Sequence, residues 1–233
     1  MTDLLKSLIQ EWHNDAADLE AVVQNRTEEE WNRETPAKGW TVKHQIRHLN
    51  WTDEMYCLAI TKPEEFQAQV EKLKVPGNTI VDDGAAHRTD IPGTEILNEW
   101  GASRARLEEL LLGLEKGARI PWIATSMGAA SAATARLMET FAHAQDVKDT
   151  FGVETVPTER LKQIAHLAIR ALPHNFKTNG LPVPQEPIFV ELTFGDERWT
   201  WNDPEASQKV SGPALDFVQL AVRRRHLDDG ALQ

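Results

Sequence analysis

The sequence has little of what marks a secreted or membrane-spanning protein. Its 233 residues include a single cysteine, Cys57, so no disulfide can form within the chain, and this usage fits a reducing cytosol. No apolar run approaches the roughly 20 residues that a helix needs to cross a bilayer. The first residues, MTDLLKSLIQEWHND, are acidic and amphipathic, which argues against a signal peptide. We therefore expect a cytoplasmic protein.

Cations are also scarce. Lys and Arg number 25 against 36 Asp and Glu, which gives a formal net charge of −11. Nucleic acids and anionic membranes are bound by clustered cations, and the local exception here is the short run Arg223–Arg225. This balance argues against nucleic acid and membrane as partners. It leaves small molecules, with the chain acting as a monomer or a homodimer.

What the sequence does contain is helical periodicity. Apolar residues at the 3.6-residue period predict four long helices, which we expect to pack as an antiparallel bundle. These helices cover about residues 4–23, 42–60, 94–115 and 131–151, and Thr41 is a suitable N-cap for the second. A shorter helix is expected around residues 63–74. The Gly-, Pro- and Asp-rich segment 75–93 is predicted to be a long loop.

The last third of the chain has a different pattern. Residues 157–172 predict a helix, which the proline-rich LPVPQEP follows. PIFVELTF and ERWTW alternate in polarity around Gly195-Asp196, which predicts a β-hairpin. A final helix is expected to begin at Ser211, with Pro213 in its first turn. The predicted fold class is α + β with two domains: a four-helix bundle over residues 1–155 and a small α+β C-terminal domain over residues 156–233.

Two side chains capable of binding a metal lie in ARLMETFAHAQDV, residues 135–147. Glu139 and His143 are four residues apart, so on a helix their Cβ atoms lie roughly 6 Å apart and both can reach one cation. An ion pair on a solvated face is the alternative. Small neighbours such as Ala142 leave space around the pair, and Asp146 could accept a proton from an imidazole nitrogen behind it. These surroundings favour a metal site.

A third ligand would come from another helix. His48, in WTVKHQIRHLNWTDE, lies beside the apolar stripe of the second helix and is the best candidate. His44, one turn earlier, and His13, in the first helix, are competitors, and a purely structural histidine is the further alternative. Asp53 lies on the inward stripe of the second helix, where it could support a metal ligand or act as a general base.

The two quoted segments together resemble the paired signature of the DinB-like metal-binding superfamily. More narrowly, they resemble the mycothiol-dependent maleylpyruvate isomerase branch of actinobacteria. The resemblance implies an up-down-down-up four-helix bundle, a smaller C-terminal domain, and a divalent metal bound by His48, Glu139 and His143. Zinc is the metal that it favours, with nickel or iron as alternatives. It also implies an arginine of the C-terminal domain near the site; we choose Arg224, although Arg223 and Arg225 are similarly placed.

The resemblance further implies mycothiol or a related thiol as cofactor. Two histidines and one carboxylate leave a coordination position open, as in catalytic metal sites, and the cation would favour the thiolate form of a bound thiol. That thiolate could attack a small electrophilic substrate, in an isomerisation or an S-transfer. Cys57 is better explained as a small core residue than as a nucleophile. We therefore predict a metal-dependent thiol transferase or isomerase.

Two other classes of function stay open. Two histidines and a carboxylate also form the facial triad of non-haem Fe(II) oxygenases, so a different metalloenzyme could use the same residues. A non-catalytic protein that binds a metal or a small molecule is the second alternative.

Overall fold

The computed structural model divides the chain into two compact units, Met1–Glu154 and Thr155–Gln233. The structure describes every residue except 1–2, 74, 76, 78 and 124. The division falls one residue before the predicted domain boundary. Each unit is described separately below.

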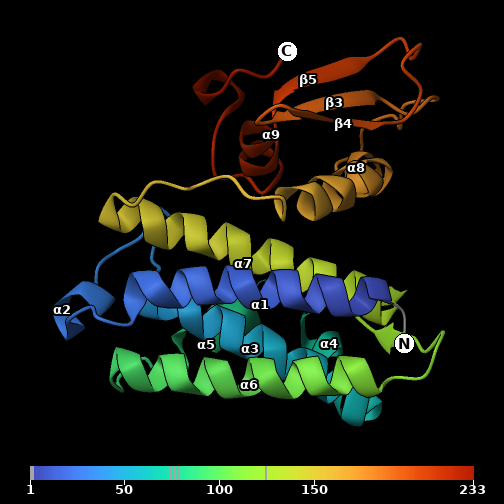
Figure 1. The fold of residues 1–233 in the computed structure, drawn as a ribbon. Coiled ribbons are helices and arrows are strands. Elements are labelled where there is room, and N and C mark those ends of the chain that lie inside the picture. Colours follow the sequence, from blue (N-terminus) through green and yellow to red (C-terminus); the bar gives the residue numbers. More distant parts are fainter. Residues whose placement is uncertain (1–2, 74, 76, 78, 124) are drawn as a thin grey trace. The chain divides into compact units, whose positions relative to one another are not determined.

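Four long helices build the first unit, and Figure 1 shows them lying along one another. They are α1 (Asp3–Val23), α3 (Val42–Thr61), α6 (Gly93–Gly113) and α7 (Ala129–Phe151). Short elements connect them: α2 (Glu28–Trp31), α4 (Pro63–Leu73), α5 (Ile80–Ala86), and the two-residue strands β1 (Ile120–Pro121) and β2 (Ser126–Met127). Thr41 is the N-cap of α3, as predicted. Residue 74, the predicted end of the shorter helix, lies outside the described residues.

The core of this unit lies where the apolar stripes of the helices meet. Trp12, Leu49, Trp100 and Leu137 are fully buried, and each comes from a different long helix. The Trp12 indole of α1 donates a hydrogen bond to Thr140 Oγ1 of α7 at 3.1 Å, which satisfies the one polar group of the indole. Burial of these large side chains holds the helices together, since each contributes roughly 1.5–3 kcal/mol.

The helix directions follow from contacts along the bundle. Arg26, just after α1, lies 4.0 Å over the ring of Phe151 at the end of α7, so these two helices run in parallel. Arg47 near the start of α3 binds Glu99 near the start of α6, so this pair is parallel too. Along α3 and α7, Gln45 contacts His143 and Asp53 contacts Arg136, so these two helices are antiparallel. The up-down-down-up connectivity that the resemblance implied is therefore confirmed. The simple antiparallel arrangement expected from the stripes is wrong for the two parallel pairs.

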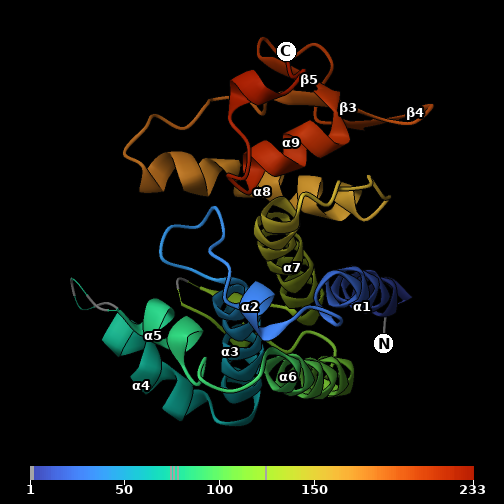
Figure 2. The same ribbon diagram turned by 90° about the vertical axis from the view of Figure 1, so that its left-hand side faces the viewer.

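Parallel neighbours need a long connection between them, and α4 and α5 provide it between α3 and α6. Figure 2 shows both short helices on the side of α3 away from α1. The predicted loop over residues 75–93 is thus wrong in part, because it contains α5. This helix depends on packing: a Cβ added at Gly84 would lie 2.8 Å from the Trp51 ring of α3, so only glycine allows this approach.

The second unit consists of a helix, a small sheet and a further short helix. Helix α8 (Leu161–Thr178) continues through Pro173, beyond the predicted end at residue 172. The sheet has the order β4-β3-β5 and contains the predicted hairpin, in which antiparallel β3 (Phe189–Phe194) and β4 (Glu197–Trp201) flank Gly195-Asp196.

The third strand of this sheet was not predicted. β5 (Lys209–Pro213) pairs in parallel with β3, with Val190 opposite Val210, so Ser211 belongs to a strand and not to the final helix. Helix α9 (Ala214–Ala221) begins after Pro213, its N-cap, and a 3₁₀ turn covers Leu227–Asp229. The predicted fold class, a helical bundle followed by a small α+β region, is confirmed.

Among the described residues, the structure contains no helix long and apolar enough to cross a membrane.

Candidate functional site: two histidines and a glutamate between α3 and α7

The antiparallel packing of α3 against α7 brings His48 opposite Glu139 and His143. Glu139 Oε2 lies 3.6 Å from His48 Nε2 and 3.4 Å from His143 Nε2. One ligand atom from each of the three residues lies within 4.8 Å of the others. Glu139 and His143 share a face of α7 because they are one turn apart, as the sequence predicted. The described part of the chain therefore places three groups of metal-ligand type at one point.

The charge of Glu139 suits this environment. Burial raises the pKa of Glu139, but its contacts with His143 and His48 and the nearby Arg136 charge outweigh that effect. The pKa consequently lies well below its ordinary value, and the carboxylate is ionised at neutral pH. Its side chain is 34% exposed, against 11% for His48 and 10% for His143, so the cluster opens on the glutamate side.

Two of the three separations between the ligand atoms suit an ion of the size of zinc. Two ligand atoms about 2.0–2.1 Å from zinc, at a tetrahedral angle, lie roughly 3.4 Å apart. The two separations from Glu139 Oε2, 3.4 and 3.6 Å, are close to that value. Imidazole nitrogens with a carboxylate oxygen are also the donor set of zinc sites with an open position. The chemistry and the spacing of these residues thus suit a divalent metal.

Two tryptophans flank the histidines. The Trp40 ring is stacked on His143 with centroids 5.9 Å apart, and it lies 5.2 Å from the His48 ring. The centroid of the Trp51 ring lies 5.9 Å from that of the His48 ring. Helix α5 supports both indoles: Asp82 accepts a hydrogen bond from Trp40 Nε1 at 3.1 Å, and Gly84 lies against Trp51.

The residue behind His143 was missed by sequence reasoning. His143 Nδ1 lies 2.5 Å from Oε1 of Gln45, a fully buried residue one turn before His48 on α3. A glutamine gives no signal in sequence unless its helix face is known to meet a histidine. Asp146, which we expected behind the imidazole, is buried on α7, and its supporting role stays a prediction.

Asp53 has a different place from the one expected. Its Oδ1 lies 2.6 Å from Arg136 Nε, and its Oδ2 accepts a hydrogen bond from Trp100 Nε1 at 3.0 Å. Burial raises the pKa of Asp53, and the arginine and indole oppose that shift. The carboxylate is fully buried and both of its oxygens contact core groups, so Asp53 forms an ion pair of the core. Its expected role as support for a metal ligand or as a general base stays a prediction.

The competing histidines are directed elsewhere. His44 Nδ1 lies 2.8 Å from Thr41 Oγ1 and takes part in the N-terminal cap of α3. His13 Nδ1 lies 3.3 Å from Glu108 Oε1 in a half-exposed pair between α1 and α6. His48 is thus the histidine of these three that faces Glu139.

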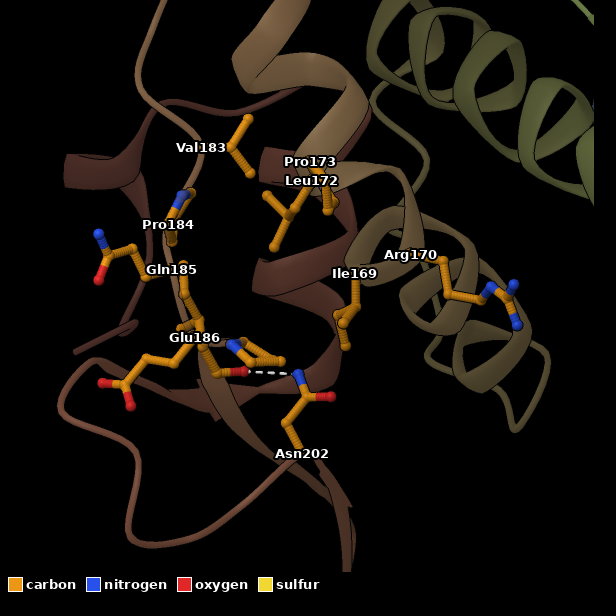
Figure 3. Close-up of a pocket in the computed structure, with 11 residues that line it drawn as sticks. Ile169, Arg170, Leu172, Pro173, Val183, Pro184, Gln185, Glu186 and Asn202 are labelled. Carbon is orange, nitrogen blue, oxygen red and sulfur yellow. Dashed lines mark hydrogen bonds between the residues drawn. The ribbon is translucent and has the colours of Figure 1, made fainter.

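Arg224 lies just after α9 in the second unit, where its Nη1 donates to the Val222 carbonyl at 2.9 Å. Its expected approach to the metal site stays a prediction. The second unit also has a cavity of about 300 Å³ between α8 and the connector that follows it. Figure 3 shows Ile169, Leu172 and Val183 at this cavity, with the Arg170 and Glu186 side chains directed away from it, so its lining offers packing and little chemistry.

Fold and site together define a four-helix bundle in which α3 and α7 join two histidines and a glutamate, followed by a small α+β unit. The family model for the mycothiol maleylpyruvate isomerase N-terminal domain matches residues 12–148, more than half of the chain. This chain therefore belongs to that family, and the resemblance seen in the sequence is confirmed.

Other proteins resemble this chain over residues of both units. Two proteins of Mycobacterium tuberculosis, uncharacterized protein MT0041 and uncharacterized protein Rv0036c, are 41% identical over 211 residues, which cover 90% of this chain and 82% of each relative. The crystal structure of a mycothiol-dependent maleylpyruvate isomerase matches with a TM-score of 0.66 and 16% identity, over 99% of this chain and 94% of that one. At that identity the solved structure shows a shared fold.

Proposed function

We propose that this chain is a metal-dependent enzyme that uses a low-molecular-weight thiol of the mycothiol type, as an isomerase or an S-transferase acting on a small electrophilic substrate. The observation that carries the proposal is the spacing of one carboxylate oxygen from two imidazole nitrogens, 3.4 and 3.6 Å, on helices distant in sequence. Family membership supports the thiol, as does the activity named for the solved neighbour.

His48, Glu139 and His143 would hold the cation. Bound there, a zinc ion would leave a coordination position for a thiol and would favour its thiolate form. Glu139 contributes a full negative charge at neutral pH, because its pKa is well below the ordinary value. Trp40 and Trp51 shield the two imidazoles from water and leave the glutamate side for ligand entry.

The thiol would have to come from outside the chain. Cys57 is 3% exposed, and burial raises its pKa to about 11, so its thiol stays protonated at neutral pH. A protonated, buried thiol is a poor nucleophile. Arg224 of the second unit is our choice to bind an anionic group of the substrate, since a guanidinium matches a carboxylate in a bidentate manner.

The experiment is a thermal-shift titration of the full chain with mycothiol, with and without added zinc and after treatment with a chelator. We expect the thiol to raise Tm only when zinc is present, because a ligand that binds the folded state stabilises it by mass action. His48→Ala should abolish this shift, and His13→Ala, which alters a histidine paired with Glu108, should retain it. Absence of any shift at saturating mycothiol in the zinc-loaded protein contradicts the proposal.

A further inference from the structure

A chain of hydrogen bonds extends from His143 to the backbone of the loop before α3. His143 Nδ1 contacts Gln45 Oε1 at 2.5 Å, and Gln45 Nε2 donates to Thr35 Oγ1 at 2.9 Å. Thr35 Oγ1 in turn donates to the carbonyl oxygen of Trp40 at 2.8 Å. Gln45 and Thr35 are 0% and 8% exposed, so water has little access to this chain. We call these three side chains and the Trp40 carbonyl the relay.

The direction of the relay is fixed at its backbone end. A carbonyl oxygen can only accept, so the single hydroxyl proton of Thr35 must point to Trp40. The Thr35 oxygen is then left to accept from the Gln45 amide nitrogen, which turns the Gln45 carbonyl oxygen toward His143. A carbonyl oxygen facing Nδ1 requires a proton on Nδ1. In the neutral ring, Nε2 therefore keeps its lone pair for a metal. The 3.4 Å contact of Nε2 with Glu139 Oε2 is a donor–acceptor contact only in the charged ring, in which both nitrogens carry a proton.

We propose that Thr35 and Gln45 are positioning residues that set the tautomer of His143 and so prepare Nε2 as a metal ligand. The inference rests on the proposed function, since it concerns the same three-residue site. The loop that carries the relay is itself held in place: the Thr35 amide also donates to the Trp40 carbonyl at 2.8 Å, and the Trp40 ring is stacked on His143. One short loop thus fixes both the plane and the protonated nitrogen of this imidazole.

His48 provides an internal contrast. Its Nδ1 is buried and has no hydrogen-bond partner among the described residues. Packing against Trp40 and Trp51 orients this ring, and its Nε2 lies 3.5 Å from Thr52 Oγ1, a much longer contact than the 2.5 Å one between His143 and the relay. The two histidines of the site are therefore prepared in different ways, and the loss of the relay should affect His143 alone.

The test compares zinc affinity and histidine tautomers in full-length variants. Thr35→Val has the shape of threonine without the hydroxyl, so the Gln45 amide can turn and present either end to His143. We expect its zinc affinity, measured by competition with a chelator, to fall about 10- to 100-fold, as for other groups that support a metal-bound histidine. Thr35→Ser should restore the affinity. Thr134→Val, which removes a hydroxyl bonded to a helix carbonyl of α7, is the matched control.

The tautomer is read directly from the ¹⁵N NMR shifts of His143 in the metal-free protein. We expect Nδ1 to be protonated in the wild type and in Thr35→Ser, and a mixture of tautomers in Thr35→Val. A merely structural role for Thr35 would change Tm without changing this signal. If Thr35→Val does not fold, Gln45→Glu, which keeps an acceptor at Nδ1, should keep Nδ1 protonated, whereas Gln45→Leu should not.

The outcomes separate the two proposals. If the wild type binds no divalent metal, the proposed function fails. If the wild type binds zinc but Thr35→Val binds it equally well and keeps Nδ1 protonated, the relay inference is overturned while the metal site stands.

Discussion

Arg47 and Arg136 are long cationic side chains that lie buried between the helices of the first unit, at 2% and 0% exposure. Each is paired with a carboxylate from a neighbouring helix: Arg47 Nη1 lies 2.5 Å from Glu99, and Arg136 Nε lies 2.6 Å from Asp53. Removing one partner of the fully buried Arg136–Asp53 pair leaves a buried charge without compensation, which costs about 3–5 kcal/mol. The loss should be smaller for Arg47–Glu99, because the Glu99 side chain is 29% exposed.

Asp53→Asn should destabilise the first unit by about 3–5 kcal/mol, because Arg136 would keep its charge in the core. Combining Asp53→Leu with Arg136→Met should cost less than either single change, since the double variant buries no charge. Urea unfolding of the metal-free variants measures these free energies. Additive losses in the double variant would contradict the pairing, and an Asp53→Asn variant that folds but no longer binds zinc would restore Asp53 to the site.

Glu99 leads to a prediction about pH. Its hydrogen bond with Arg47 lowers the pKa of Glu99 and outweighs the effect of burial, which raises it. A folded pKa below the unfolded one means that this contribution is complete above the ordinary value of 4.5 and is lost as pH falls through the folded pKa. Glu99→Gln should therefore destabilise the protein by about 1–3 kcal/mol at neutral pH. The difference in unfolding free energy between this variant and the wild type should shrink as pH falls below 4.5.

The measurement is the free energy of unfolding of Glu99→Gln and of the wild type, from neutral pH down to the lowest pH at which both still fold. If the stability lost in Glu99→Gln stays constant or grows toward low pH, the Glu99 carboxylate is not ionised at its contact with Arg47.

The residues of the site differ in how far sequence could reveal them. Glu139 and His143 could be paired because helical spacing alone places them on one face. His48 could be proposed because it lies beside an apolar stripe. Gln45 could not, because its importance arises from a contact with a histidine 98 residues away. The ion pair of Asp53 could not be predicted for a related reason: a sequence does not show that an arginine of another helix lies beside an inward carboxylate.

At the scale of elements, α5 is a segment that packs against both tryptophans of the site. It has seven residues, too few for a stable isolated helix, and it holds its place by contact with α3. Gly84→Ala adds a Cβ 2.8 Å from the Trp51 ring, so the indole or α5 must move. Alanine would favour an isolated helix, but overpacking here should cost about 1–3 kcal/mol.

The measurement is the unfolding free energy of Gly84→Ala, with Gly101→Ala as control, because a Cβ at Gly101 of α6 meets no atom within 4 Å. We expect Gly101→Ala to stabilise by up to about 1 kcal/mol through helix propensity alone. If both variants become more stable, α5 does not depend on close approach to Trp51.

The elements that sequence reasoning missed are those that tertiary contacts create. The long helices could be predicted because each carries its own apolar stripe. The strand Lys209–Pro213 contains a glycine and a proline, and it becomes a strand by pairing with β3. Likewise, the composition of residues 75–93 indicates a loop, but Ile80–Ala86 form a helix whose Gly84 and Ala85 are buried. The helix predicted to end at residue 172 continues through Pro173 to Thr178.

At the scale of the whole molecule, the residues that we propose to bind the metal belong to one unit, and the arginine that we propose to bind the substrate belongs to the other. His48, Glu139, His143 and every member of the relay belong to Met1–Glu154, as do Trp40 and Trp51. Arg224 belongs to Thr155–Gln233. If the proposed function holds, the two units make separable contributions, one to the cation and the other to an anionic substrate.

The fragment 1–154 should therefore fold and bind zinc as tightly as the full chain, because it contains the complete bundle core and the complete ligand set. It should have no thiol-dependent turnover, and full-length Arg224→Ala should likewise keep zinc affinity and lose turnover. Chelator competition on the fragment, the variant and the wild type measures the first effect, and an assay with mycothiol measures the second. A tenfold loss of zinc affinity in the folded fragment, about 1.4 kcal/mol, would place part of the metal site's support in the second unit.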